Sequence, residues 1–204
     1  WWGGSRRACG ARYGVGSDPE GRGGTGLDGE RGGADRVRFG GKGPLWLKFA
    51  SRTPGAHGAY THFSASATRI AANLISDLEA VTEIEQQTPG NIQAVLAAAS
   101  EAIDKAQGEG ASKILQRVTL NTGVVRGGLK VNMVPSECII EADIRLPVGI
   151  EKEQVMEVVN DIVAGYPEAT MEEINFSAPS WCDPEGEMLK IVQANVTELK
   201  GFTP

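Results

Sequence analysis

The sequence predicts an α+β domain: a ferredoxin-like sandwich in which a four-stranded antiparallel sheet carries helices on one face. Two observations predict this fold. Four strand-like segments alternate with helix-like segments whose apolar residues fall three or four apart. With one inserted helix left out, the order from Pro44 to Phe176 is β-α-β-β-α-β, which is the order of two split β-α-β units. Such a sheet tolerates one solvated face, while its open edges invite pairing with a second copy.

The first strand is predicted within residues 37–52 and the first helix over 65–81. Leu45, Leu47 and Phe49 alternate with other residues in the period-two pattern of a half-buried strand. The helix carries a single apolar stripe, made of Ile70, Leu74, Leu78 and Val81. Ser64 or Ser66 is expected to cap its N-terminus, because a serine hydroxyl can accept a free backbone N–H there.

A second, alanine-rich helix is predicted from Ile92 to Ala106, as an insertion lying on the surface and ending at the glycines after it. Strands follow at 115–125 and 137–146, and a short irregular link is expected at 130–135. In the strand 137–146, Glu141, Asp143 and Arg145 share the face opposite the apolar residues, since successive side chains point opposite ways.

The remaining elements are an amphipathic helix at 151–163, a strand at 169–176 and a last helix that starts at Asp183-Pro184 and ends near Lys200. Three regions are therefore expected. Residues 1–36 form an irregular Gly/Arg-rich segment, 37–178 form the sandwich, and 179–204 are a return segment leading into the start of another domain.

Charge and composition separate the N-terminal segment from the rest. Residues 1–43 contain 15 of the 27 glycines and carry a net charge of +3, which leaves −9 for the remainder. The segment has almost no Val, Ile or Leu, so the burial of its apolar surface cannot offset the conformational entropy lost on ordering it. An acidic body argues against nucleic acid as a partner.

Several classes of protein are excluded by what the sequence lacks. No apolar run is long enough to span a bilayer, and no signal peptide is expected at the start. The three cysteines are far apart, which favours a reducing, cytoplasmic location over a disulfide framework. With two histidines and no metal-ligand, nucleophile-elbow or phosphate-loop motif, the chain does not predict a self-contained enzyme site.

Three residues are candidates for chemistry. His57 lies on a tight loop between a strand and a helix, Asn132 lies between a glycine turn and Pro135, and Arg145 projects from the non-core face of its strand. Each has a structural alternative: a capped turn for His57, a turn-capping amide for Asn132, and an ion pair with a neighbouring carboxylate for Arg145. Together they form a set suited to bind a carbonyl oxygen and a carboxylate.

Five motifs in order resemble the lid (dimerisation) domain of the two-domain zinc amidohydrolases, a family that includes aminoacylase, acetylornithine deacetylase, succinyl-diaminopimelate desuccinylase and glutamate carboxypeptidase. The motifs are Gly43–Leu47, Ala56–His62, Asn121–Gly128, Val131–Pro135 and Asp143–Pro147. The resemblance covers about Val37 to Pro204, and Ser180–Pro184 is similar to the family's return segment towards its catalytic domain.

The resemblance implies hydrolysis of N-acyl amino acids or small peptides with zinc in the parent enzyme, by a homodimer that pairs through the lid. It implies that His57 stabilises the oxyanion in the partner subunit's active site, that Asn132 contacts substrate and that Arg145 binds the substrate carboxylate. The zinc ligands and the general base belong to another domain, so this fragment alone is expected to bind no zinc and to be inactive.

A different interpretation of the same residues is a free-standing, non-enzymatic ferredoxin-like domain. It would bind a small carboxylate or simply self-associate.

Overall fold

The computed structural model describes residues 40–86, 88–183 and 185–201. The chain divides into two compact units, and the larger is Lys42–Pro179. The smaller contains the flanking residues on both sides, up to Gly41 and from Ser180. The expected irregular segment 1–36 lies outside the described residues, and the predicted division into three regions stays a prediction.

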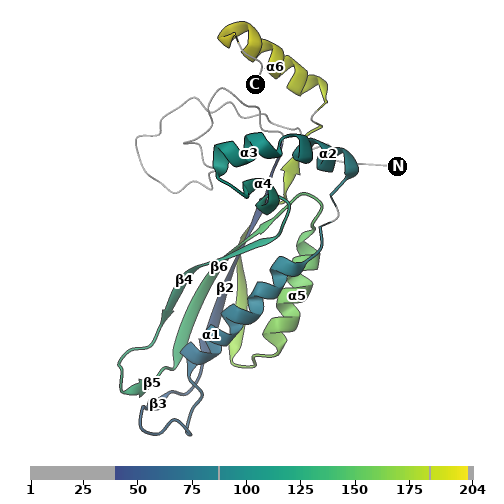
Figure 1. The fold of residues 1–204 in the computed structure, drawn as a ribbon. Coiled ribbons are helices and arrows are strands. Elements are labelled where there is room, and N and C mark those ends of the chain that lie inside the picture. The colour runs from purple at the N-terminus through teal and green to yellow at the C-terminus, as the bar shows by residue number, and fades with distance from the viewer. Residues whose placement is uncertain (1–39, 87, 184, 202–204) are drawn as a thin grey trace, which may run out of the picture. The chain divides into compact units, whose positions relative to one another are not determined.

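The larger unit is built on a four-stranded sheet (Figure 1). Its strands are β2 (Gly43–Arg52), β4 (Thr119–Gly127), β6 (Glu137–Leu146) and β7 (Ala169–Phe176), in the spatial order β4-β6-β2-β7. Every pairing is antiparallel. This is the ferredoxin-like arrangement that the sequence predicted, with the first and third of the four strands in the centre.

Two helices cover one face of this sheet (Figure 1). They are α1 (Ala67–Leu78), which continues into a short 3₁₀ helix at Glu79–Glu83, and α5 (Lys152–Ala164). The Ser66 hydroxyl accepts the backbone N–H of Arg69, so the predicted cap is Ser66. A reciprocal capping box opens α5, because the Glu151 N–H donates to the Gln154 side chain.

The core fills the space between the sheet and the two helices. From β2 and β6 it takes the alternating residues that the period-two pattern predicted, and from α1 it takes the apolar stripe. Its largest fully buried side chains include Phe49, Leu45, Leu47, Leu74, Leu78, Ile140 and Ile144. The opposite face of the sheet, called here the open face, carries half-buried polar and aromatic residues such as Trp46 and Arg145.

The predicted helix 92–106 is wrong in detail. Residues 90–114 form three shorter helices, α2 (Gly90–Ala98), α3 (Ser100–Gln107) and α4 (Ala111–Ile114). The first two are broken at Ala99. Of these residues only Ile92 and Ser112 are buried. High alanine content favours helix, but without an apolar stripe against the core nothing holds one long helix straight.

The link 130–135 was predicted to be irregular, and this is also corrected. It contains β5 (Met133–Val134), which pairs antiparallel with β3 (Ala56–His57) at one end of the main sheet (Figure 1). Two-residue strands are too short to show a period, so the sequence pattern could not predict them.

The smaller unit pairs β1 (Gly40–Gly41) with β8 (Ser180–Trp181) and then forms α6 (Glu187–Lys200). The helix begins at Glu187, a few residues later than predicted, and ends at Lys200, where it is capped by Gly201, whose φ of 76° suits glycine. Among the described residues, no helix is both long and apolar enough to cross a membrane.

Candidate functional site

The β3–β5 ladder brings the backbone of Asn132 to the residue after His57. The Gly58 N–H donates to the Asn132 carbonyl at 2.7 Å. A Cβ on Gly58 would lie 2.9 Å from the carbonyl carbon and oxygen of Asn132, so only glycine permits this approach. The ladder and its flanking loops, residues 53–66 and 128–136, are called the tip. Two of the three predicted site residues therefore lie together there.

The imidazole of His57 is exposed at the tip and oriented by its own loop. Its Nδ1 accepts the Ala59 N–H at 3.2 Å, while the Tyr60 N–H donates to the His57 carbonyl at 2.8 Å. Because Nδ1 accepts a hydrogen bond, the neutral ring carries its proton on Nε2. This arrangement leaves Nε2–H as the donor of an exposed side chain.

The tip loop exposes three further rings beside His57. Tyr60 lies with its centroid 5.8 Å from that of His57, and His62 stacks on Phe63 with centroids 4.2 Å apart. Tyr60 and Phe63 are 53% and 70% exposed. Ser64 holds the loop closed, because its Oγ accepts the N–H of Gly55, where φ is 71°. A hollow of about 490 Å³ lies between this loop, the start of α1 and residues 131–135.

Arg145 lies near the other end of β6, opposite Pro44 of β2 and Thr119 of β4. Its Nε and Nη2 donate to Asp143 Oδ2 at 2.9 and 2.8 Å, and Asp143 Oδ1 accepts the Trp46 indole N–H at 2.9 Å. The ion pair weighed from the sequence is therefore present. It uses one edge of the guanidinium and leaves Nη1 without a protein partner among the described residues.

A single copy does not bring Arg145 to the other two candidates. Arg145 lies about 26 Å along β6 from Glu137, since a strand advances about 3.3 Å per residue. Glu137 directly follows the tip. Within one copy, the three candidates therefore do not form the single set that was expected, because the two ends of a continuous strand cannot come together. Counting residues along the predicted strand would have revealed this separation.

The sequence analysis missed Lys42, which follows the glycine-rich segment. Its Nζ donates to Thr119 Oγ1 at 3.3 Å on the open face. Burial, and next the charge of Arg145, lower the pKa of Lys42 from 10.5 to about 8. The signal was available, because Lys42 shares the parity of Pro44 and Trp46 and so belongs to the open face. The end of the sheet that holds Lys42 and Arg145 is called the base.

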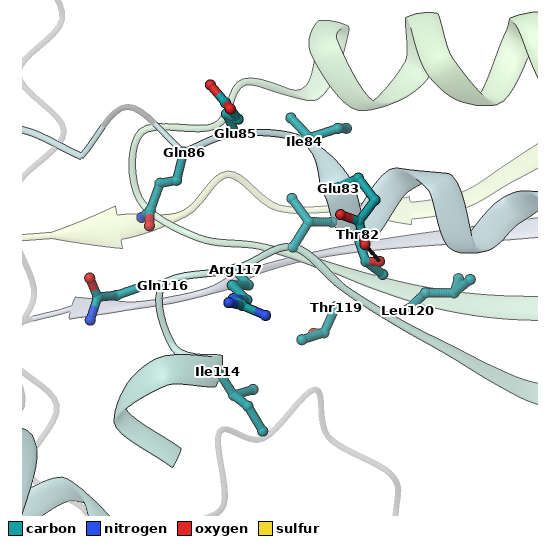
Figure 2. A pocket seen from close by; sticks show the side chains of 11 residues that line it. Thr82, Glu83, Ile84, Glu85, Gln86, Ile114, Gln116, Arg117, Thr119 and Leu120 are labelled. Atoms are coloured by element: carbon teal, nitrogen blue, oxygen red, sulfur yellow. Dashed lines mark hydrogen bonds between the residues drawn. The ribbon is translucent and has the colours of Figure 1, made fainter. Parts of the chain in front are cut away.

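A groove of about 510 Å³ lies beside the base, between residues 82–86 and 114–120. Figure 2 shows Glu83 and Thr82 on one wall and Arg117 and Gln116 on the other. Gln86 closes one end by donating to the Val148 carbonyl at 2.8 Å. None of the three candidate residues lines this groove.

No three His, Cys, Asp or Glu side chains gather closely enough to hold a metal ion within the part of the chain that the structure describes. His57 and His62 are both at the tip, and no carboxylate is paired with either in this part of the chain. The described residues therefore do not fit a zinc site.

Three solved structures are among the most similar to this one. They are an M20 family metallo-carboxypeptidase from Sulfolobus solfataricus (TM-score 0.66, 16% identity), the dipeptidase Dug1p from Saccharomyces cerevisiae (0.60, 13%) and aminopeptidase PepT from Bacillus cereus (0.55, 16%). Each likeness covers 81% of this chain but only 45%, 42% and 38% of the respective neighbour. The chain thus spans less than half the length of these proteins, and the likeness shows a shared fold.

A search of curated proteins found no match. The family model described as the peptidase dimerisation domain of M20 peptidases matches residues 39–170, which is more than half of the chain. These residues contain the whole of β2, α1, β4 and β6, together with His57, Asn132 and Arg145. The chain therefore belongs to the M20 peptidase dimerisation domain family.

Proposed function

We propose that this chain is the lid and dimerisation domain of a zinc-dependent amidohydrolase or peptidase that cleaves N-acyl amino acids or small peptides. Support comes from the family match and from neighbours described as a carboxypeptidase, a dipeptidase and an aminopeptidase. In this proposal the zinc ligands and the catalytic base lie on another domain. The lid contributes side chains that bind substrate, and a second copy is its partner.

The observation that carries the proposal is the exposed Nε2–H of His57. An N–H donor aimed at the oxygen that gains negative charge in amide cleavage stabilises the transition state. The hydrogen bond from Ala59 to Nδ1 fixes the tautomer that such a donor needs. The Asn132 backbone lies beside it through the hydrogen bond from Gly58, which supports a role for the Asn132 amide in binding the same substrate.

The distance between tip and base supports a proposal in which the candidates serve two different active sites. The chain enters the larger unit at Lys42 and leaves it at Pro179, and both residues lie at the base. A domain joined there is near Arg145 but about 26 Å from the tip. In the proposed dimer, Arg145 therefore binds a carboxylate in its own subunit, while His57 and Asn132 reach the active site of the partner copy.

Self-association is assigned to the edge formed by β4. The sheet order leaves β4 and β7 at the two edges. Two β7 edges would bring together the exposed carboxylates of Glu172 and Glu173, whereas the β4 edge exposes Val125 and no acid. Unpaired strand edges are templates for pairing with another chain, so the edge without acids, whose one charged residue is Arg126, is the better one.

This assignment is tested by adding one charge to each edge. Val125→Asp on β4 is expected to weaken self-association at least tenfold in sedimentation equilibrium. Ile174→Asp on β7 is the matched control, since Val125 and Ile174 are 54% and 47% exposed. Equal weakening by both variants, or a wild-type chain that stays monomeric at high concentration, would refute the β4 dimer.

The exchange of residues between subunits is tested by mixing two impaired variants of a protein in which the chain is joined to a zinc-binding catalytic domain of the family, with activity assayed at a substrate concentration well below KM. One variant carries His57→Ala and the other Arg145→Ala. A mixed dimer contains one intact site, with Arg145 from one subunit and His57 from the other. After subunit exchange, activity is expected to return to about a quarter of wild type, since half the dimers are mixed.

If activity does not recover, the proposed active site with Arg145 from one subunit and His57 from the other is refuted. Wild-type activity in the His57→Ala variant alone would instead refute the role of His57. Were the joined protein inactive towards every N-acyl amino acid and dipeptide, the non-enzymatic interpretation of the domain would replace the proposal.

A further inference from the structure

The side chain of Lys42 lies across the end of β6. Lys42 directly precedes β2, and Thr119 belongs to β4, while β6 separates these two strands in the sheet. To donate its hydrogen bond to Thr119 Oγ1, the Lys42 side chain therefore crosses the width of one strand on the open face. Thr119 is the register partner of Arg145, so the ammonium group is placed beside the guanidinium.

Two cations are thus held near each other, and one carboxylate pairs with Arg145. Asp143 pairs with Arg145 and also accepts the Trp46 N–H, and both of its oxygens are used. No carboxylate lies within ion-pair distance of Lys42 Nζ among the residues that the structure describes. Arg145 and Asp143 are the charged groups that face Lys42 from β6, and Thr119 of β4 is neutral. The cluster carries one uncompensated positive charge.

We propose that Lys42 and Arg145 form a two-cation binding site for a carboxylate on the open face of the sheet. Asp143 and Trp46 fix the guanidinium by one edge and leave Nη1 to donate. Thr119 fixes the ammonium, which keeps two further N–H donors. A carboxylate whose oxygens bridge these donors supplies the negative charge that the pair lacks.

The ligand class follows from the donors. One carboxylate suffices to bridge both cations, and the half-buried position favours a group at the end of a small molecule over a chain segment. That this carboxylate belongs to the substrate of the hydrolase rests on the proposed function. The anion site itself does not, because it requires only residues of the larger unit.

The test uses the full chain of 204 residues, labelled with ¹³C at lysine Cε and ¹⁵N at arginine Nε, and titrated with glutarate at constant ionic strength. Glutarate is expected to shift the Lys42 and Arg145 signals with one saturation curve. It is also expected to raise the pKa of Lys42 above its starting value of about 8, because a bound anion favours the ammonium form. Glutaramide, a neutral analogue, should do neither.

Two variants separate binding from structure. Lys42→Met is expected to weaken glutarate at least fivefold, and Lys42→Arg should keep the affinity within about twofold. Lys48→Met is the matched control, since Lys48 lies on the same face of the sheet, in the strand that Lys42 directly precedes, but pairs with Glu172 at 3.8 Å. It should leave the affinity unchanged.

A glutarate effect equal at Lys48 and Lys42, or no change in the Lys42 pKa at saturation, would overturn the site. The wild-type titration decides this even where a variant fails to fold. Failure of the hydrolase proposal is distinguished by its own readout, because loss of amide cleavage leaves glutarate binding to this chain intact.

Discussion

The two ends of β6 hold their functional groups in different ways. At the tip, backbone hydrogen bonds position His57, and a glycine lets the Asn132 backbone come close. At the base, side chains hold one another: Asp143 binds both Arg145 and Trp46, and Lys42 reaches Thr119. The tip should therefore respond to changes in loop geometry, whereas the base should respond to charge, salt and pH. Four predictions test this difference, from the largest expected effect to the smallest.

His57→Ala should lower kcat of the lid joined to its catalytic domain by about 10²–10³-fold, because one oxyanion donor is lost. Arg145→Ala should act mainly on KM, since a carboxylate contact persists from substrate to transition state. Steady-state kinetics on an N-acyl amino acid measure both. His62→Ala is the control at the tip, and a loss as large as that of His57→Ala would contradict the assignment.

Gly43→Ala should destabilise the fold by about 1–3 kcal/mol through overpacking. At this site a Cβ would lie 2.2 Å from the Ser177 carbonyl oxygen and 2.6 Å from Pro179 N, which are backbone atoms of the base. Gly58→Ala meets backbone at the tip and should change the free energy of unfolding by less than about 1 kcal/mol, since only a two-residue ladder depends on it. Urea denaturation compares them, and a reversed order would refute the distinction.

Ser51→Ala should raise the free energy of unfolding by about 1 kcal/mol. The Ser51 side chain is fully buried, and its Oγ has no hydrogen-bond partner among the residues that the structure describes, so removing the hydroxyl relieves a desolvation cost. Ser64→Ala should instead lower the free energy of unfolding, because its hydroxyl accepts the Gly55 N–H at the tip and that hydrogen bond is lost. Thermal unfolding of both variants checks the sign, and destabilisation by Ser51→Ala would show that its hydroxyl is satisfied.

The smallest effect is expected for the pH dependence of the free energy of unfolding of Lys42→Met relative to wild type. The folded-state pKa of about 8 lies below the ordinary 10.5, so the fold disfavours the ammonium form. This cost is complete below pH 8 and disappears as pH rises to about 10.5, where both states are neutral. The variant should therefore be more stable than wild type at pH 7, with a difference that shrinks towards pH 10.5. A difference independent of pH would contradict the shifted pKa.

Much of the fold could be predicted because it rests on long periodic segments. The strands 137–146 and 169–176 have the predicted bounds, and the stripe on α1 is buried as expected. Helix α5 differs from its predicted range by one residue at each end. In contrast, β3 and β5 depend on a contact between residues 56–57 and 133–134, and no local pattern encodes such a pairing.

The sequence names the candidate residues one by one, but it does not give their arrangement. Motif resemblance singles out His57, Asn132 and Arg145, and their roles stay predictions. Which of them lie together depends on the direction of β6, which places two near its start and one near its end. Lys42 escaped notice because a single lysine after a glycine-rich segment has no partner visible in the sequence. Its partner Thr119 is 77 positions away.

The two-residue pairing of β3 with β5 has a kinetic consequence. A ladder this short can open and close without disturbing the ten-residue pairing of β2 with β6 beneath it. The amide of Gly58 should thus exchange with solvent deuterium long before that of Ile140. Because His57 belongs to this short ladder, its imidazole can move away when the ladder opens and return when it closes, while the main sheet stays folded.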